Sequence, residues 1–342
     1  MRFKTAARRI LFPCFVRDEM NVPLPEWYRE VPGGSWYSFG PENPDRAFYV
    51  IWRPHRGAGF FSNFTQVVTH IVAAERRGLV PVVDQLNFPT LYNVAEPVDG
   101  RRNAWEYYFE QPGGVSLEEV YRSARVFVPD GNYPTDFPED YRTFFETHFP
   151  LRPAVAERIG RYREAVTAKR TLGIHFRGKE MNYAPRHRFA PTAAQIFRFA
   201  DRLMEEHALE QIFLVTEEEC YREAMARRYG ARLLCTDAFR SRRVNSYNLS
   251  PRPAHRYLLG LEILADAELL ALCTGLLASD TGPASHAARR SRSLEFAAFI
   301  DNGVNAGNYL AARFLWPLKR ILPAGFGGLP GRLRIFGPGE FR

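Results

Sequence analysis

The sequence has few cysteines, and none of them is spaced to hold a metal ion. The four residues Cys14, Cys220, Cys235 and Cys273 are scattered over 342 positions, without a Cys-x-x-Cys or Cys/His pattern. Isolated cysteines in a chain of this length are typical of reduced thiols in a cytosolic protein. We therefore expect a cytoplasmic protein with neither a disulfide framework nor a bound metal.

Long apolar runs are missing as well. No run of 18 apolar residues occurs, so no membrane-spanning helix is expected. The first 20 residues begin with basic side chains, but Pro13 breaks their short apolar run, and this makes a poor signal peptide. The phosphate-binding loop GxxxxGK[ST] is absent, which disfavours a kinase or an ATPase.

Acidic residues are fewer than basic ones, and most of the basic residues are arginine. Lys and Arg number 46 against 38 Asp and Glu, and the net charge is +8. A basic surface suits nucleic acid, an anionic membrane face or a phosphorylated ligand. The arginines are spread through folded-looking segments, and a guanidinium pairs bidentately with phosphate. This favours separate anion pockets over a nucleic-acid stripe, and no RNA-recognition module is present.

The chain divides into an arm, two α/β halves and a tail. Residues 1–45 form an arm rich in Pro, Gly and aromatic residues, which predicts irregular structure. The first half, 46–150, begins with a strand, a glycine-containing loop, a helix at 64–78 and a second strand at 79–84. This order predicts the start of a parallel sheet.

The second half, residues 151–310, alternates strands and helices more regularly. Strands are expected at 171–176, 211–216, 231–236, 275–280 and 294–300. Such a Rossmann-like half binds ligands at the carboxyl ends of its strands. Residues directly after each strand are therefore the first candidates for a site.

The tail, residues 311–342, has six Lys or Arg and one acid, interleaved with leucine and aromatic residues. One interpretation is a surface that lies on an anionic bilayer. The other is a helix that packs on its domain, followed by a disordered end.

A basic loop follows the strand that ends in GIHF. An arginine just beyond a buried strand, here Arg177, suits a diphosphate, because a guanidinium is always charged and contacts two oxygens. An ion pair with Glu180 or another carboxylate is the alternative. His175, inside the strand, is expected to have a structural or supporting role, and Gly178 follows Arg177.

Two further strands end in polar residues. Glu217 opens a run of three glutamates, which either caps the next helix or contacts a ribose or base. Hydroxyls and free N–H groups at the start of a helix make an anion site. A predicted helix start of this type carries Asp280, Thr281, Gly282 and Ser285. Two anion-suited loops in one half indicate a phosphorylated nucleotide.

The first half offers candidates of its own. Gly57 and Gly59, with Phe60 and Asn63, precede or begin a helix, which fits either close approach of a ligand or a tight turn. The segment NAWEYYFEQP holds Trp105 and Tyr107, which are either rings on the acceptor side or part of the core.

These segments together resemble the fucosyltransferase superfamily that includes nodulation and core α-1,6-fucosyltransferases and protein O-fucosyltransferases. GIHFRGKE is similar to its motif H-x-R-[RG]-x-D, IFLVTEE to a strand ending in T-[DE], and the segment around SDTGPASHAA to its nucleotide loop. Order and spacing fit over residues 46–300. Two departures are Glu180, where the family mostly has Asp, and Gly178, where it has a second arginine.

The resemblance implies a GT-B fold, in which two Rossmann-like domains face each other across an interdomain cleft. It implies an inverting, metal-independent glycosyltransferase that uses GDP-fucose, with Arg177 on the β-phosphate. Glu180 and His187 are the candidates for the base that accepts the acceptor's proton. The expected acceptor is a glycan or a lipid-linked glycan, in polysaccharide or glycolipid synthesis, at the inner membrane face. The alternatives are another nucleotide sugar or a non-catalytic nucleotide- or sugar-binding protein.

Overall fold

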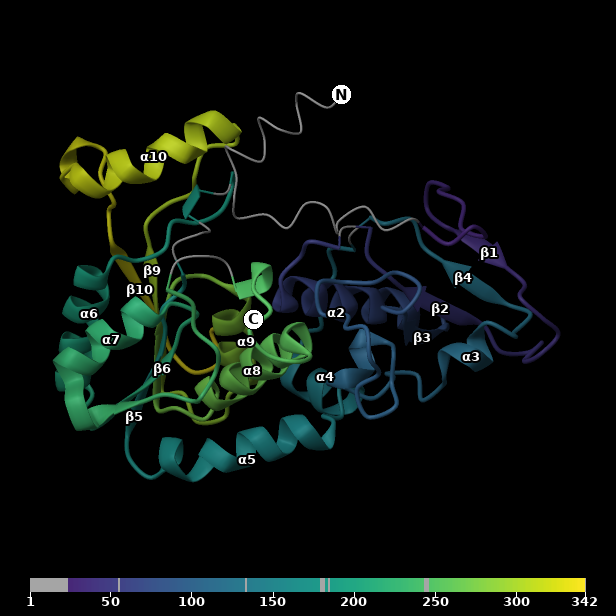
Figure 1. The fold of residues 1–342 in the computed structure, drawn as a ribbon, viewed down its shortest axis with the longest axis horizontal. Coiled ribbons are helices and arrows are strands. Elements are labelled where there is room, and N and C mark those ends of the chain that lie inside the picture. The colour runs from purple at the N-terminus through teal and green to yellow at the C-terminus, as the bar shows by residue number, and fades with distance from the viewer. Residues whose placement is uncertain are drawn as a thin grey trace. The chain divides into compact units, whose positions relative to one another are not determined.

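The computed structural model describes residues 24–54, 56–132, 134–178, 182–183, 185–242 and 246–341. The chain forms two compact units. Figure 1 shows the ribbon coloured by residue number. Unit 1 holds the residues up to Ala156 together with Tyr247–Leu261, and unit 2 holds Glu157–Ser246 together with Glu262–Arg342. No helix in the described part of the chain combines the length and apolarity that crossing a membrane requires.

Unit 1 contains a four-stranded sheet in the order β1-β4-β2-β3. Its elements are β1 (Ser35–Tyr37), β2 (Phe48–Ile51), α2 (Phe60–Arg76), β3 (Val80–Val83), the 3-10 helix η1 (Ala104–Tyr107), α3 (Leu117–Val120), β4 (Val126–Val128) and α4 (Tyr141–His148). β2 pairs in parallel with β3 and β4, whereas β1 runs antiparallel to β4. The strands and the helix expected at the start of the first half are confirmed.

The prediction that the arm is irregular is wrong for part of its described residues, 24–45. Within it, β1 adds an edge strand to the sheet of unit 1, and the ring of Trp36 lies 5.3 Å from that of Phe127 on β4. Trp27 contacts Tyr37 and Phe39 edge to face. Aromatic residues that looked like loop composition are therefore packing residues of the sheet and its core.

Helix α2 begins four residues earlier than the pattern predicted. Gly59 occupies the position before it with extended backbone, so the glycine loop runs directly into the helix. At the other end Gly78 has φ +65°, a left-handed conformation that glycine adopts without strain, and it ends the helix as predicted. Most of α2 is buried, because its apolar side chains recur on the face toward the sheet.

Residues 247–261 belong to unit 1, although the sequence order puts them in the second half. Tyrosines hold them there. The hydroxyl groups of Tyr247 and Tyr92 are hydrogen-bonded to each other, and the Tyr108 hydroxyl donates to the carbonyl of Tyr257 at 3.0 Å. These contacts join segments about 150 residues apart, which local sequence patterns do not report.

Unit 2 contains a six-stranded sheet in the order β10-β9-β8-β5-β6-β7. Its elements are β5 (Thr171–His175), α6 (Ala193–Glu206), β6 (Gln211–Val215), α7 (Glu219–Tyr229), η3 (Gly230–Arg232), β7 (Leu233–Leu234), β8 (Gly275–Ala278), α9 (Gly282–Arg290), β9 (Phe296–Asp301), α10 (Tyr309–Ile321), η5 (Ala324–Phe326) and β10 (Arg332–Phe336). Helices α5 (Pro153–Thr167) and α8 (His255–Leu270) and the 3-10 helix η4 (Ser246–Asn248) each begin in one unit and continue in the other.

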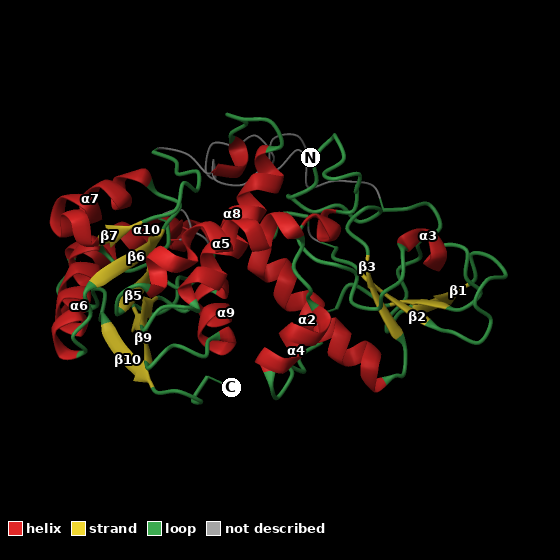
Figure 2. Ribbon diagram, turned by 90° about the horizontal axis from the view of Figure 1, so that it is seen from below, coloured by secondary structure: helices red, strands yellow, loops and turns green. Residues whose placement is uncertain are grey.

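The helices of unit 2 cover both faces of its sheet. Figures 1 and 2 show α6 and α7 on one face and α8 and α9 on the other. The strands β5, β6 and β8 are accordingly buried along their whole length, as parallel strands between helix layers must be. Thr192 caps α6 in a reciprocal capping box with Gln195, as the sequence predicts for the cap.

The five predicted strands of unit 2 are present, and the tail adds a sixth. β10 pairs antiparallel with β9 over its whole length. The prediction of a disordered end is therefore wrong for residues 332–336. β10 was missed because an edge strand with one solvent-facing side, here RLRIF, is only weakly apolar.

Candidate active site

Three strand ends meet at one edge of the unit 2 sheet. β5 lies between β6 and β8 in parallel, and His175 is aligned with Val215 on one side and Ala278 on the other. The loops that follow these strands therefore start next to each other. They carry residues that the sequence analysis selected, beginning with Arg177.

Arg177 interacts electrostatically with an acid from each neighbouring loop. Partial burial of the guanidinium lowers the pKa of Arg177, whereas the carboxylates of Glu217 and Asp280 oppose that shift. An arginine keeps its positive charge under such conditions. Arg177 thus carries a fixed positive charge close enough to two carboxylates to interact with both, and ion pairing and anion binding both stay open for it.

Gly178 and Glu217 fit each other closely. The amide of Gly178 donates a hydrogen bond to Oε1 of Glu217 at 3.1 Å. A Cβ atom at position 178 would lie 2.2 Å from Oε1 and 2.8 Å from Cγ of Glu217. A side chain at position 178 therefore has no room while Glu217 keeps its place.

The Glu217 carboxyl group is crowded by protein atoms even though the residue as a whole is exposed to solvent. This crowding raises the pKa of Glu217, Arg177 opposes the rise, and the adjacent Glu218 adds to it. Glu218, and not Glu217, is the residue at the cap position of α7, and no side chain forms a capping hydrogen bond there. The bond from Gly178 argues against the capping interpretation, and contact of Glu217 with a ribose or base stays a prediction.

His175 is hydrogen-bonded to the residue that precedes α9. Its Nδ1 lies 2.9 Å from the Thr281 hydroxyl, and both residues are buried. Burial and the nearby Arg177 lower the pKa of His175 to about 3, so the imidazole is neutral at physiological pH. Thr281 precedes α9 without capping it. The hydroxyl lies within hydrogen-bond distance of His175 instead, and the supporting role of that histidine stays a prediction.

The start of α9 combines an acid with hydrogen-bond donors. Asp280 accepts from the Ser285 hydroxyl at 3.3 Å and pairs with Nε of Arg188 at 3.0 Å. Gly282 is the first residue of the helix and is exposed. An incoming phosphate at the positive end of the helix would meet Asp280, which is paired with Arg188.

The two candidates for the base are Glu180 and His187. Glu180 lies outside the described residues. His187 is partly buried, and its carbonyl accepts a hydrogen bond from the Asn305 amide at 2.8 Å. Burial, and then the charge of Arg177, lower the pKa of His187. A neutral imidazole is therefore present in the electrostatic neighbourhood of Arg177.

The glycine loop of unit 1 remains accessible at its glycines. Gly57 is partly exposed and Gly59 is exposed. Phe60 and Asn63 are buried. The Phe60 ring contacts those of Tyr92 and Tyr108 edge to face, and the Asn63 side chain donates to the Ala58 carbonyl at 3.3 Å.

Trp105 and Tyr107 lie in the core of unit 1, each with 3% of its surface exposed. The Trp105 ring stacks on Phe109 at 4.5 Å, and its indole N–H donates to the Glu110 carbonyl at 3.1 Å. The Tyr107 hydroxyl donates to the Arg102 carbonyl. Both polar atoms already have partners, so the core role, which the sequence left open, is the one that this geometry supports.

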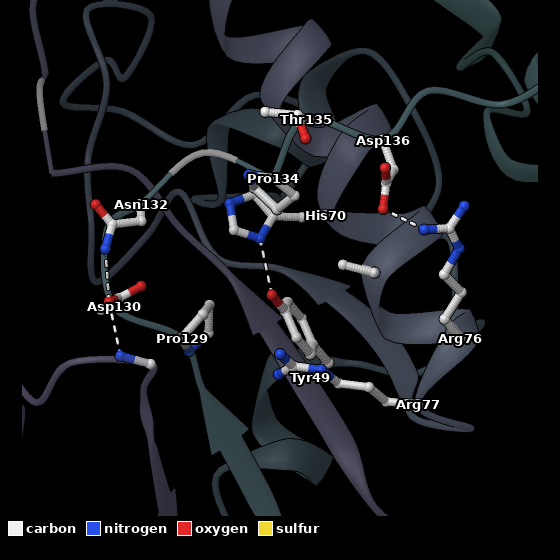
Figure 3. A pocket seen from close by; sticks show the side chains of 12 residues that line it. Tyr49, His70, Arg76, Arg77, Pro129, Asp130, Asn132, Pro134, Thr135 and Asp136 are labelled. Carbon is white, nitrogen blue, oxygen red and sulfur yellow. Dashed lines mark hydrogen bonds and ion pairs between the residues drawn. The ribbon is translucent and has the colours of Figure 1, made fainter.

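Unit 1 also has a cavity of about 440 Å³ that no motif indicated. It lies between α2 and the loop after β4, as Figure 3 shows. The Tyr49 hydroxyl and Nδ1 of His70 are 2.9 Å apart at its wall, and Arg76 pairs with Asp136 at its rim. None of the site residues selected from the sequence lines it. Its lining comes from four separated segments, which explains why sequence patterns miss it.

Within the described ranges, no group of three or more His, Cys, Asp or Glu side chains is arranged to hold a metal ion. Cys220, Cys235 and Cys273 are free thiols.

The two α/β units, each built on a mainly parallel sheet, match the GT-B fold of solved fucosyltransferase structures. This confirms the fold class that the motifs implied. Solved structures of fucosyltransferases share this fold. NodZ from Bradyrhizobium is 14% identical, with a TM-score of 0.52 over 77% of this chain and 99% of that one. NodZ α-1,6-fucosyltransferase co-crystallised with GDP gives 14% identity and a TM-score of 0.53, over 85% of this chain and 98% of that one.

The same enzyme soaked with GDP-fucose gives 14% identity and a TM-score of 0.52, covering 85% of this chain and 99% of the other. At this level of identity the likeness shows the fold. No family model matches the sequence, and no curated protein matches it.

Proposed function

We propose that the protein is an inverting glycosyltransferase that transfers fucose from GDP-fucose to a glycan acceptor. The observation that carries the proposal is the position of Arg177 at the strand edge, beside the start of α9 and the His175–Thr281 pair. Fucosyltransferases that share the fold have been crystallised with GDP and with GDP-fucose.

In this mechanism the acceptor hydroxyl attacks the anomeric carbon while the bond from that carbon to the β-phosphate oxygen breaks. GDP leaves, and its new negative charge is stabilised by Arg177 and by the N–H groups at the start of α9. Preorganised charge of this kind is usually the largest catalytic contribution. The donor enters as a cosubstrate, and the reaction as proposed uses no metal.

The proton of the acceptor hydroxyl goes to a base in the loop after β5. His187 is neutral beside Arg177 and can accept it, whereas Glu180 occupies the position of the family's acid. The donor side also includes His175, which is hydrogen-bonded to Thr281. It includes Gly178, which donates to Glu217, and that carboxylate interacts electrostatically with Arg177. Contact of Glu217 with the ribose or base of the donor is part of the same proposal.

The acceptor side is assigned to unit 1, with Gly57 and Gly59 as the accessible part of the loop before α2. We place the reaction in polysaccharide or glycolipid synthesis, in the cytoplasm and at the inner face of the membrane. The free thiols of Cys220, Cys235 and Cys273 agree with a reducing compartment. The domain boundaries at 45, 150 and 310 remain predictions.

Calorimetric titration with GDP, UDP and CMP, followed by an assay of GDP release from GDP-fucose with glycan acceptors, tests the proposal. Binding of GDP alone together with acceptor-dependent release supports it. Binding of UDP or CMP in place of GDP indicates a different donor. Nucleotide binding without turnover on any donor favours the non-catalytic alternative, and no binding of any nucleotide overturns both.

A further inference from the structure

Helix α10 exposes a continuous apolar face. Leu310, Phe314, Leu318 and Ile321 recur at intervals of four, four and three residues, which places them on one side of the helix. Their exposed fractions lie between 49% and 78%, and Phe326, just beyond the helix, is 80% exposed. Scattered apolar residues on a surface are ordinary, but a contiguous set of this kind marks an interaction surface.

The opposite side of α10 is firmly packed. Ala312 and Trp316 are buried, and the Trp316 ring stacks on that of Phe189 at 5.7 Å. Asn308 caps the helix by accepting from the amides of Leu310 and Ala311. These contacts fix α10 on unit 2, so the side chains of its opposite face point to solvent.

The segment that carries this face has charge of one sign. Residues 302–339 contain no Asp or Glu and have five Lys or Arg. Two of these, Lys319 and Arg320, lie in the last turn of α10, and Arg320 is exposed. An apolar helix face with basic flanks and aromatic side chains is the pattern of a helix that lies in the interface of an anionic bilayer.

The segment 302–339 is also hydrogen-bonded to the loop that follows β5. The Asn305 side chain donates to the carbonyls of Asn182 and Ala312, and the Arg186 amide donates to the Ala306 carbonyl. Arg188 and Val304 form a β-bridge. The loop that bears His187 is thus fastened to the base of α10. Figure 1 shows α10 at the end of unit 2 opposite α5.

We propose that the outer face of α10 (Leu310, Phe314, Leu318 and Ile321), together with Phe326 of η5, seats unit 2 on an anionic lipid bilayer. A second copy of the chain or another protein would be expected to place acids against the basic flank, and the acid-free segment 302–339 offers none of its own for a symmetric contact. A bilayer supplies both the anionic headgroups and the apolar layer. If the proposed transfer is correct, the acceptor is then a lipid-linked glycan presented at that bilayer.

The test is co-sedimentation of the full-length protein with vesicles of phosphatidylcholine alone and with phosphatidylglycerol added. We expect binding to the anionic vesicles and at least about tenfold weaker binding to the neutral ones. The substitutions Phe314→Glu and Ile321→Glu, separately and together, should weaken binding to anionic vesicles by about tenfold or more. Point substitutions are preferable to truncation after 310, because truncation would remove strand β10.

The matched control is Leu86→Glu, which alters an exposed leucine of unit 1 that is 43% accessible. It should bind vesicles like the unaltered protein. Unchanged thermal unfolding of the α10 variants excludes misfolding as the cause. Equal binding to both vesicle types, undiminished binding of the α10 variants, or an oligomer that these variants dissociate would each overturn the proposal. The vesicle assay contains no GDP-fucose, so its result does not depend on whether the protein transfers fucose.

Discussion

The Gly178 amide donates to Glu217 at 3.1 Å, and the same carboxylate fills the space that a side chain at 178 would need. A β-carbon there would displace Glu217 both from this hydrogen bond and from its place beside Arg177. The two positions are therefore coupled, because Glu217 can keep its place only while position 178 has no β-carbon.

Gly178→Ala should destabilise the protein by about 1–3 kcal/mol and weaken GDP binding, since Glu217 must move aside. Adding Glu217→Ala removes the obstruction. In a double-mutant cycle the two substitutions should deviate from additivity by about 1 kcal/mol, with the double variant less impaired than the sum. Denaturant unfolding and GDP calorimetry measure both quantities. Strictly additive effects would show that the contact does not constrain position 178.

Arg177→Ala should reduce transfer by about 10²–10³-fold, because it removes the cation that faces the departing diphosphate. Arg177→Lys keeps the charge but loses the forked geometry, so it should recover only part of the rate. Arg202→Ala is the matched control, since Arg202 is an exposed arginine of α6 that pairs with Glu206. Near-normal turnover by Arg177→Ala at saturating donor would remove Arg177 from the mechanism.

Acidification should destabilise unit 2 through His175. In the unfolded chain this histidine binds a proton below pH 6.5, whereas in the folded protein its pKa is about 3. The stability contributed by neutral His175 is therefore complete above pH 6.5 and is lost progressively as the pH falls toward 3. Between pH 7 and pH 5 the loss should be about 2 kcal/mol.

Unfolding free energies measured at pH 7 and pH 5 check this expectation. His175→Gln cannot take up the proton, yet it can still hydrogen-bond to Thr281, so it should show a smaller loss between the two pH values. An identical pH dependence in the variant would mean that other groups, such as His70 with its pKa of about 4, account for the whole effect.

The sequence predicted the parts of this structure that depend on local patterns. The strands β5, β6 and β8 are short apolar runs, and the polar residues after them fall at one edge because parallel strands share an orientation. The fit between Gly178 and Glu217 could not be predicted, since it joins two loops 39 residues apart. β10 was missed because its outward side chains are polar, and the burial of Trp105 was left open because an aromatic ring suits both a core and a sugar site.

Substitutions of Trp105 distinguish these two roles. Trp105→Ala should destabilise unit 1 by about 3–5 kcal/mol, because it leaves a cavity among the rings of Phe64, Phe109 and Phe149. Trp105→Phe keeps most of the packing and loses the indole hydrogen bond to Glu110, so it should cost far less. Unfolding measurements on both variants check the order.

Kinetics of Trp105→Phe supply the decisive comparison. A core residue acts on activity only through the fraction of folded protein, so this variant should keep the KM for the acceptor once it is fully folded at the assay temperature. A ring that contacted the acceptor would give the opposite result, a higher acceptor KM with stability nearly unchanged. Since the Trp105 side chain has 3% of its surface exposed and its N–H is already bonded, we expect the first result. The acceptor contacts should then be sought at Gly57 and Gly59, where the loop before α2 is open to solvent.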